Sequence, residues 1–397
     1  MMQRKDDPES GLQLSRRNAI KRIGVAAAMA AVVPGVALSQ SGTTPAVPPT
    51  TVTNPPRDFG PGAPPVVYPD PDILVVDPLF NKYRVGNTSI VRLWTGGLWS
   101  EGPAWSSQGQ YLVWSDIPNN RQMRWLQEDG HVSVYRMPSN NSNGNSFDFQ
   151  GRQLSCEHLT RRVVRHENDG SVTVIADSYN GKRLNSPNDL APHPDGSTWF
   201  TDPAYGDSLY EGAPDAAGGP SNETGHLKSH LGQAAEIGNL KGELPMNVYR
   251  ADPSGKVDMV VGADQLPYPN GIAFSPDYKR VYIVSRADLY SFDVGGNNRL
   301  SNQKLFSDFM IDGVKCGTDG IRVDVDGNVW CGSNAGGHVG YGGVTVWTPE
   351  AKLIGRIRLP EACANLTFGG PKRNRLFMAA STSLYAVYVN TQGASPG

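Results

Sequence analysis

Residues 319–334, DGIRVDVDGNVWCGSN, carry the pattern that decides the fold. An acid and a glycine begin a short apolar segment, a turn rich in Asp and Gly follows, and a second apolar segment starts at Val329. Gly and Asp tolerate the backbone dihedrals of tight turns, so the stretch predicts two antiparallel strands joined as a hairpin. Residues 270–285, NGIAFSPDYKRVYIVS, show the same order of features, which makes the pattern a repeat.

The repeat occurs six times along the chain, at intervals of roughly 45 residues. One longer interval contains an insertion of about 35 residues, at about 206–244, which we expect to form a lid over one face. Repeats of this length made of short strands are typical of propeller blades. The sequence therefore predicts an all-β, six-bladed β-propeller; a pair of β-sandwiches is the alternative. The second strand of each unit begins near Tyr111, Gln153, Thr198, Val281, Val329 and Leu376.

The last repeat, from Asn365 to about Asn390, has room for only three strands. We expect the segment around Ser89–Trp94 to supply the fourth, because a strand from the N-terminal side would close the ring and remove an unpaired sheet edge.

Residues 1–40 have the features of an export signal. Arg16-Arg17 is followed by an uncharged apolar run, 23–38, which is shorter than the roughly 20 residues of a membrane span. This arrangement resembles the bacterial twin-arginine signal. It predicts a periplasmic or secreted protein with no stable membrane span after cleavage; a retained N-terminal anchor is the alternative. Residues 41–71 are rich in Pro and predict a linker, which leaves 72–397 for the propeller.

The charge balance of the chain bounds its partners. The net charge is −2 and charged residues are 19% of the sequence, so no basic footprint exists for nucleic acid or an anionic membrane. Hydrophobic residues, at 38%, suffice for a sizeable core and exclude a disordered chain. A small molecule is the expected partner, and the oligomeric state is left open.

An acid or an amide stands about ten residues before the second strand of every repeat. In a propeller this position begins the innermost strand of each blade, so the six side chains should converge at one mouth of the central channel. Two carboxylates and four amides suit a hard divalent cation, Ca²⁺ before Mg²⁺. Turn capping is the alternative reason for such residues. The six are Glu101, Asn143, Asn188, Asn270, Asp319 and Asn365.

Residues that follow the second strand of a blade are expected on the same face as this ring. Glu157-His158 is the most suggestive pair, because a histidine can move a proton near neutral pH; a plain hydrogen-bonding role is the alternative. In the insertion, His226 and His230 are spaced to share one helix face, and a solvated face is expected there. The residues at these second-strand ends are Asp116, His158, Asp202, Arg286 and His338.

Four cysteines lie in a domain expected outside the cytoplasm, where disulfides persist. Cys316 and Cys363 shortly precede ring positions of adjacent blades, and a bridge between them is the pairing that the spacing allows. Cys156 and Cys331 fall on opposite sides of the ring and should not pair.

Several strings, in order, resemble the gluconolactonase and senescence-marker-protein (regucalcin) family of calcium lactonases: SEGPAW, SPNDL, PNGIAF, TDGIRVDVDGNVW and ANLTFGG. SDIPNNRQMRW and CEHLTRRVVR look like the bacterial gluconolactonase branch. The resemblance covers residues 90 to 390. It implies a six-bladed propeller that hydrolyses a sugar lactone, with Ca²⁺ held by Glu101, Asn188, Asn270 and Asp319.

One position departs from the family. Animal lactonases of the family carry an Arg two places before the blade-three Asn, where it helps to hold substrate, and Ser186 stands there in this chain. Substrate preference therefore does not carry over from that branch. Residues expected to contact substrate are Asn143, Ser186, Asn188 and Asn365.

The cation implied by the resemblance would polarise a lactone carbonyl for attack by water. Asp319 is the expected catalytic carboxylate, as a base or, as considered for related phosphotriesterases, a nucleophile, and His158 is a second catalytic candidate. Mg²⁺, Mn²⁺ or Zn²⁺ are alternatives to Ca²⁺. A phosphotriesterase or other ester hydrolase, and a non-catalytic propeller that binds a protein or glycan, are the alternative functions.

Overall fold

The computed structural model describes residues 47–205 and 242–396, and residues 48–397 form one compact unit. The expected export signal, and residues 206–241 of the expected lid with His226 and His230, lie outside the described residues. Over the described ranges, no helix is long and apolar enough to cross a membrane.

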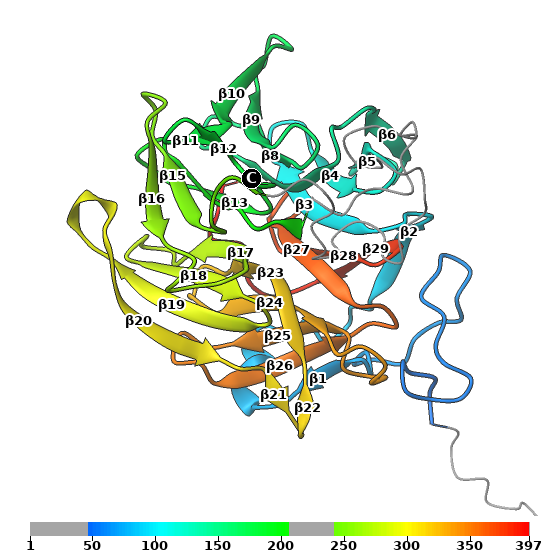
Figure 1. Cartoon of the computed structure of the whole chain (residues 1–397). Coiled ribbons are helices and arrows are strands. Elements are labelled where there is room, and N and C mark those ends of the chain that lie inside the picture. The colour runs from blue at the N-terminus through cyan, green and yellow to red at the C-terminus, as the bar shows by residue number, and fades with distance from the viewer. Residues whose placement is uncertain (1–46, 206–241, 397) are drawn as a thin grey trace, which may run out of the picture. The chain divides into compact units, whose positions relative to one another are not determined.

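Six antiparallel sheets are arranged around an axis, each with its first strand innermost (Figure 1). This confirms the predicted all-β, six-bladed propeller. Blade one contains β3 (Ser100–Ser106), β4 (Tyr111–Asp116), β5 (Arg121–Leu126) and β6 (Val132–Arg136). Blade two contains β7 (Ser142–Phe147), β8 (Gln153–Glu157), β9 (Arg162–His166) and β10 (Val172–Ala176). Blade three contains β13 (Leu190–Pro192), β14 (Thr198–Thr201), β15 (Val248–Ala251) and β16 (Val257–Val261).

The other three blades follow in chain order. Blade four contains β17 (Pro269–Phe274), β18 (Arg280–Ser285), β19 (Asp288–Val294) and β20 (Leu300–Ser307). Blade five contains β23 (Gly317–Val323), β24 (Val329–Asn334), β25 (Gly343–Trp347) and β26 (Leu353–Arg358). Blade six contains β27 (Cys363–Gly369), β28 (Arg375–Ala380), β29 (Ser383–Tyr388) and, as predicted, a strand from the N-terminal side, β2 (Val91–Thr95).

Short elements connect or extend the blades. Two-stranded ribbons are formed by β11 (Ser178–Tyr179) with β12 (Lys182–Arg183), and by β21 (Met310–Ile311) with β22 (Val314–Lys315). The helical pieces in the described ranges are two 3-10 turns, Pro78–Lys82 and Gly296–Asn298.

The hydrophobic core is divided among the interfaces between blades. Trp199 of blade three packs with Phe274 of blade four, and Trp105 of blade one stacks on Phe377 of blade six. Each of the six interfaces has a cluster of this kind. The apolar surface is thus used between the sheets, which leaves the inner strands at the axis free to carry polar side chains.

The segment expected to be a linker is built into the propeller from residue 48 onward. Arg57 is buried and pairs with Asp70 at 2.6 Å and with Asp72 at 3.2 Å. Phe59 packs edge-on against Tyr385 of blade six. A further strand, β1 (Ile73–Val75), pairs with β26 as a fifth strand of blade five. The Pro-rich composition indicated an extended chain, but a few buried side chains fix that chain onto the outside of the ring.

The disulfide between Cys316 and Cys363 is not formed, and all four cysteines are free and buried. Cys316 belongs to the cluster between blades four and five, whereas Cys363 belongs to the one between blades five and six. Each thiol faces a backbone carbonyl, that of Val314 or Asn365, instead of the other sulfur. The bridge that the spacing left open is absent because proximity to the ring along the chain does not bring two side chains to the same interface.

Candidate functional site

The inner strands are irregular at the positions where the ring residues stand. In β3, β7, β17, β23 and β27 the pairing register with the second strand shifts around the predicted residue, as it does between Glu101 and Ala104. Such bulges redirect a side chain from the ordinary alternation of a strand. In blade three the same position, Asn188, lies just before β13 begins. The repeat therefore has a common backbone device that turns one polar residue per blade out of its sheet.

Glycines bring these residues close to one another. A Cβ on Gly102 would overlap the carbonyl of Asn143 in the next blade, and one on Gly144 would overlap that of Asn188. Gly271 stands in the same relation to Asp319 in the neighbouring blade. The inner strands of adjacent blades thus approach at van der Waals distance where the ring residues stand. This packing brings the ring positions of adjacent blades next to one another.

A single amide links the two ends of the ring. The Nδ2 of Asn365 donates to Glu101 Oε2 at 3.1 Å and to Asp189 Oδ2 at 3.3 Å. Arg322 Nη1 lies 3.3 Å from the same Asp189 oxygen, and Asp189 is buried. Side chains from blades one, three, five and six therefore form one network at the axis.

Asp189 and Arg322 are functional candidates that the sequence analysis missed. Asp189 occupies the repeat position that is Gly in four other blades, as at Gly102 and Gly320. A carboxylate at a position otherwise reserved for close backbone approach was the available signal. Arg322, a charge within the buried strand β23, was a second one. The ring therefore contains three carboxylates and one guanidinium, not two carboxylates alone.

Burial raises the pKa of all three ring carboxylates, and neighbouring carboxylates add to this for two of them. Burial, followed by the nearby Asp319 and Asp189, raises the pKa of Glu101 well above its usual value. Burial and Asp189 raise the pKa of Asp319 to about 7, although a hydrogen bond with Asn270 lowers it. Burial also raises the pKa of Asp189, against the effect of Arg322. Burial thus disfavours the charged forms of all three acids, and a cation bound among them would relieve this cost.

Buried oxygens at the ring lack hydrogen-bond donors. Asn143 Oδ1, Asn270 Oδ1 and Asp319 Oδ1 have no donor among the described residues. At Asn188 the atom without a partner is Nδ2, and rotation of that amide by half a turn would place its oxygen there. Buried polar atoms are normally satisfied, so oxygens left over beside carboxylates fit a hard cation. No three His, Cys, Asp or Glu side chains in the described part of the chain form a ready-made metal cluster, and the available donors are mixed amide and carboxylate oxygens.

His158 is buried beside the ring. Its Nε2 lies 3.2 Å from Asn143 Nδ2, and burial lowers the pKa of the imidazole to about 3. The imidazole of His158 is therefore neutral at physiological pH, and its Nε2 accepts a hydrogen bond from the Asn143 amide. Glu157 does not orient this histidine, because its carboxylate binds Arg162 Nε at 2.6 Å and Thr160. The arrangement favours a positioning role for His158 over proton transfer.

Three further candidates have structural hydrogen bonds. Ser186 is buried and its hydroxyl donates to the carbonyl of Pro203 at 2.7 Å. Asp116 pairs with Arg121 at 2.9 Å, and Asp202 accepts from the backbone of Asn185 at 2.8 Å. These contacts fix the loops around the channel mouth.

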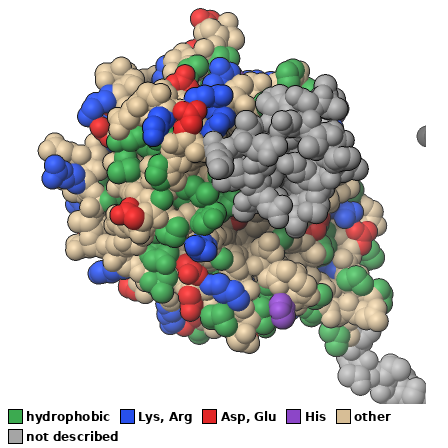
Figure 2. Space-filling model, in the orientation of Figure 1, with side chains coloured by type: hydrophobic (Ala, Val, Ile, Leu, Met, Phe, Trp, Pro, Cys, Tyr) green, Lys and Arg blue, Asp and Glu red, His purple; other side chains and the backbone are tan. Residues whose placement is uncertain are grey.

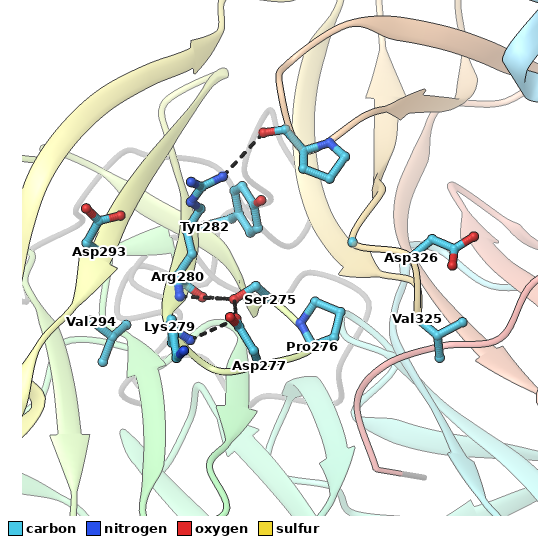
Figure 3. Close-up of a pocket in the computed structure, with 12 residues that line it drawn as sticks. Ser275, Pro276, Asp277, Lys279, Arg280, Tyr282, Asp293, Val294, Val325 and Asp326 are labelled. Atoms are coloured by element: carbon cyan, nitrogen blue, oxygen red, sulfur yellow. Dashed lines mark hydrogen bonds between the residues drawn. The ribbon is translucent and has the colours of Figure 1, made fainter.

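A cavity of about 590 Å³ lies away from the ring, among turns of blades four and five (Figure 3). The first of these turns follows β17, so it stands at the opposite end of that strand from Asn270. Asp277 in this cavity hydrogen-bonds Ser275 and the backbone of Lys279 within its own turn. No ring residue lines the cavity, and its polar groups serve the turns. On the face shown in Figure 2, acidic and basic side chains are interspersed, as the small net charge predicts.

Comparison with known proteins gives consistent matches over the propeller. Residues 99–382 match the family model described as "SMP-30/Gluconolactonase/LRE-like region". A gluconolactonase of Zymomonas mobilis is 28% identical over 320 residues, covering 74% of this chain and 80% of that protein. The structure of a gluconolactonase from Xanthomonas campestris has 30% identity and a TM-score of 0.66, covering 83% of this chain and 98% of that one. The diisopropyl-fluorophosphatase of Loligo vulgaris is 24% identical over 327 residues, covering 77% of this chain and 90% of that protein.

Proposed function

The chain belongs to the SMP-30/gluconolactonase/LRE-like family, and we propose that it is a lactone hydrolase of the gluconolactonase type that depends on Ca²⁺. Similarity to two gluconolactonases over most of the propeller supports the reaction class. The observation that carries the proposal for this chain is the buried ring, in which three carboxylates lie beside amide and carboxylate oxygens without donors.

Glu101, Asn188, Asn270 and Asp319 are the residues that would hold the cation. They supply two carboxylates and two amides, so the formal charge of the donors would balance a divalent ion. The mixed oxygen set favours Ca²⁺ over Mg²⁺, and over Zn²⁺, which takes nitrogen and sulfur ligands. When bound, the cation would polarise the lactone carbonyl and stabilise the charge that develops on its oxygen.

Asp319 is the residue that we assign to proton transfer. As a residue it is less buried than Glu101 or Asp189, although its Oδ1 is itself buried. Its Oδ1 has no donor among the residues described, which leaves it able to accept a proton from an attacking water. His158 and Asn143 would then shape the side of the site in blade two, and Asn365 would hold Glu101 in place.

A phosphotriesterase activity is the second candidate. The similarity to the squid diisopropyl-fluorophosphatase favours it, since that match spans 90% of that protein. A cation that polarises a carboxylic ester can equally polarise a phosphoryl oxygen. A non-catalytic binding module is less consistent with the ring, because burying three carboxylates together costs stability that a scaffold has no reason to forgo.

A pH-stat assay tests these functions together. Purified protein would be given a panel of sugar lactones, simple lactones and phosphotriesters, with Ca²⁺ and with a chelator. We expect acid release from a sugar lactone that chelation abolishes and Ca²⁺ restores. Asp319→Asn should lower the rate by about 100-fold or more, as expected when a general base is lost. Asp326→Asn, which removes a surface carboxylate of the same blade paired with Lys82, should keep the full rate. Equal rates in Asp319→Asn and the wild type would refute the assignment.

We also propose that the protein acts outside the cytoplasm, on the strength of Arg16-Arg17 and the apolar run after it. Replacing both arginines by lysine should leave the full-length protein in the cytoplasm of a bacterial host, whereas the unchanged chain should be recovered from the periplasm or medium. Recovery of the lysine variant outside the cytoplasm would contradict this route.

A further inference from the structure

Arg286 occupies a strained turn beside the ring. It is the first of two residues that join β18 to β19, since Ser285 pairs directly with Asp288. Its φ is +58°, and Tyr268, whose carbonyl accepts from the Arg286 backbone at 3.0 Å, has a φ of +51°. A glycine is the usual residue where a two-residue hairpin begins with positive φ. Arg286 thus places a long cationic side chain at a position where glycine would be usual.

The turn lies between two residues of the proposed cation site. Tyr268 stands two residues before Asn270 in the chain. The carbonyl of Ala287 accepts from the backbone of Thr318, the residue before Asp319, at 3.4 Å. The Arg286 side chain is thereby placed at the rim of the ring, on the side of blades four and five.

Aromatic groups hold the guanidinium in this position. Its carbon lies 5.0 Å from the centre of the Tyr268 ring, a cation–π contact. The phenol of Tyr205 is largely buried, which raises its pKa; Asp319 and Tyr268 raise it further, and Arg286 lowers it. Tyr205 therefore lies within electrostatic range of both Asp319 and Arg286.

Arg286 has no anionic partner among the described residues, in contrast to two other arginines on this face. Arg121 and Arg162, at corresponding hairpins of blades one and two, are paired with Asp116 at 2.9 Å and Glu157 at 2.6 Å. Arg286 is exposed and has no carboxylate within salt-bridge distance among the described residues. The guanidinium is thus held against the Tyr268 ring, and its charge is available to a ligand.

We propose that Arg286 binds an anionic group of the substrate, a carboxylate or a phosphate, and makes the site selective for acidic sugar lactones over neutral ones. This inference rests on the lactone hydrolase function proposed above. The guanidinium fork matches both carboxylate and phosphate oxygens. The ring of site residues is rich in carboxylates, which repel an anionic group on the substrate. An acidic substrate therefore needs a cation at the rim. Arg286 meets that need at the edge next to Asp319.

The test is a ratio of kcat/KM values. The substrates are a lactone of an aldaric acid, which carries a free carboxylate, a phosphorylated aldonolactone, and neutral glucono-1,5-lactone. In Arg286→Gly, a substitution that suits the positive φ and should fold, the acidic-to-neutral ratio should fall by about 10-fold or more, as expected when a charge-assisted hydrogen bond is lost. Arg286→Lys should give an intermediate ratio. The two acidic substrates show whether carboxylate or phosphate is preferred.

Arg299→Gly is the matched control, because it removes the same charge from an exposed residue of blade four beyond the far end of β19. It should leave the ratio unchanged. An unchanged ratio in Arg286→Gly would overturn the proposal. If the wild type hydrolyses no lactone, the proposed function fails, and calorimetric binding of the open aldarate and of inorganic phosphate then decides this inference. Equal affinities in the wild type and Arg286→Gly would overturn it.

Discussion

The amide nitrogen of Asn365 lies 3.1 Å from the carboxylate of Glu101, although the two residues belong to the last and first blades of the ring. The same nitrogen lies 3.3 Å from Asp189 of blade three. One amide therefore donates to two buried carboxylates that repel each other. This amide joins the polar side chains of the last and first blades, at the point where the propeller closes.

Asn365→Leu, which keeps the approximate shape and removes both donors, should lower the free energy of unfolding by about 1–3 kcal/mol, because both carboxylates lose a hydrogen bond in a buried site. Urea unfolding in the presence of chelator measures this. The control is Asn390→Leu, whose amide donates to the Lys82 carbonyl at 2.9 Å on the surface, with an expected effect within about 0.5 kcal/mol. Equal losses of unfolding free energy in the two variants would show that the Asn365 contacts stabilise the fold no more than a surface hydrogen bond does.

The ring carboxylates should make the cation-free protein less stable at higher pH. The folded-state pKa values of Glu101 and Asp319 are raised, so their contribution is greatest at low pH and is lost as pH rises through about 7 for Asp319. Melting temperatures in chelator should therefore fall between pH 5 and pH 8 more for the wild type than for Asp319→Asn. Saturating Ca²⁺ should remove most of the difference. Equal changes of melting temperature with pH in the wild type and Asp319→Asn would contradict this.

The contribution of His158 to stability should have the opposite pH dependence. Burial lowers its folded-state pKa to about 3, so the stability that depends on the neutral imidazole is present above pH 6.5 and is lost as pH falls from there toward 3. His158→Gln, which can still bond to Asn143, should lose less stability than the wild type between pH 7 and pH 4.5. His131→Gln, at an exposed position, serves as the control. If the imidazole is not the proton donor, the acid limb of the pH–rate profile should also be the same in His158→Gln; a displaced limb would restore a proton-transfer role.

Arg57 should be essential to the packing of the N-terminal segment. Arg57→Met leaves Asp70 and Asp72 buried without one cationic partner, which typically costs about 3–5 kcal/mol. Arg92→Met is the matched control, because its pairing with Asp58 is exposed and 3.7 Å long, and surface pairs contribute at most about 1 kcal/mol. Urea midpoints of the two variants give the comparison. Similar midpoints would indicate that residues 48–71 are only loosely attached.

The repeat period predicted the fold and the ring because one backbone device recurs in each blade. Glu101 and Asp319 could be placed together from spacing alone, since a closed ring brings equivalent positions to one axis. Asp189 could not be found in this way, because it lies one place outside the common register. Its role depends on Asn365 and Arg322, which approach it only in three dimensions.

The N-terminal segment shows the other limit of sequence reasoning. Its composition is that of an extended chain, and the chain is largely extended, but Arg57 and Phe59 each find a buried partner that no local pattern indicates. The disulfide that the sequence left open is absent for a related reason: Cys316 and Cys363 are near neighbours of ring residues along the chain, and their side chains enter different interfaces. The repeat spacing predicts where the strands lie, whereas these contacts depend on which interface an individual side chain enters.

The pairing of Val91 with Ala386 sets the order of events during synthesis. Strand β2 leaves the ribosome before blades one to five, but its partner β29 emerges only after all of them. Until then the nascent chain carries an unsatisfied strand at its front and an open ring behind it, both of which can recruit a neighbouring polypeptide. The toroid can therefore close only after β29 has been made, and a stop after β26 but before β29 would leave five complete blades and a free edge.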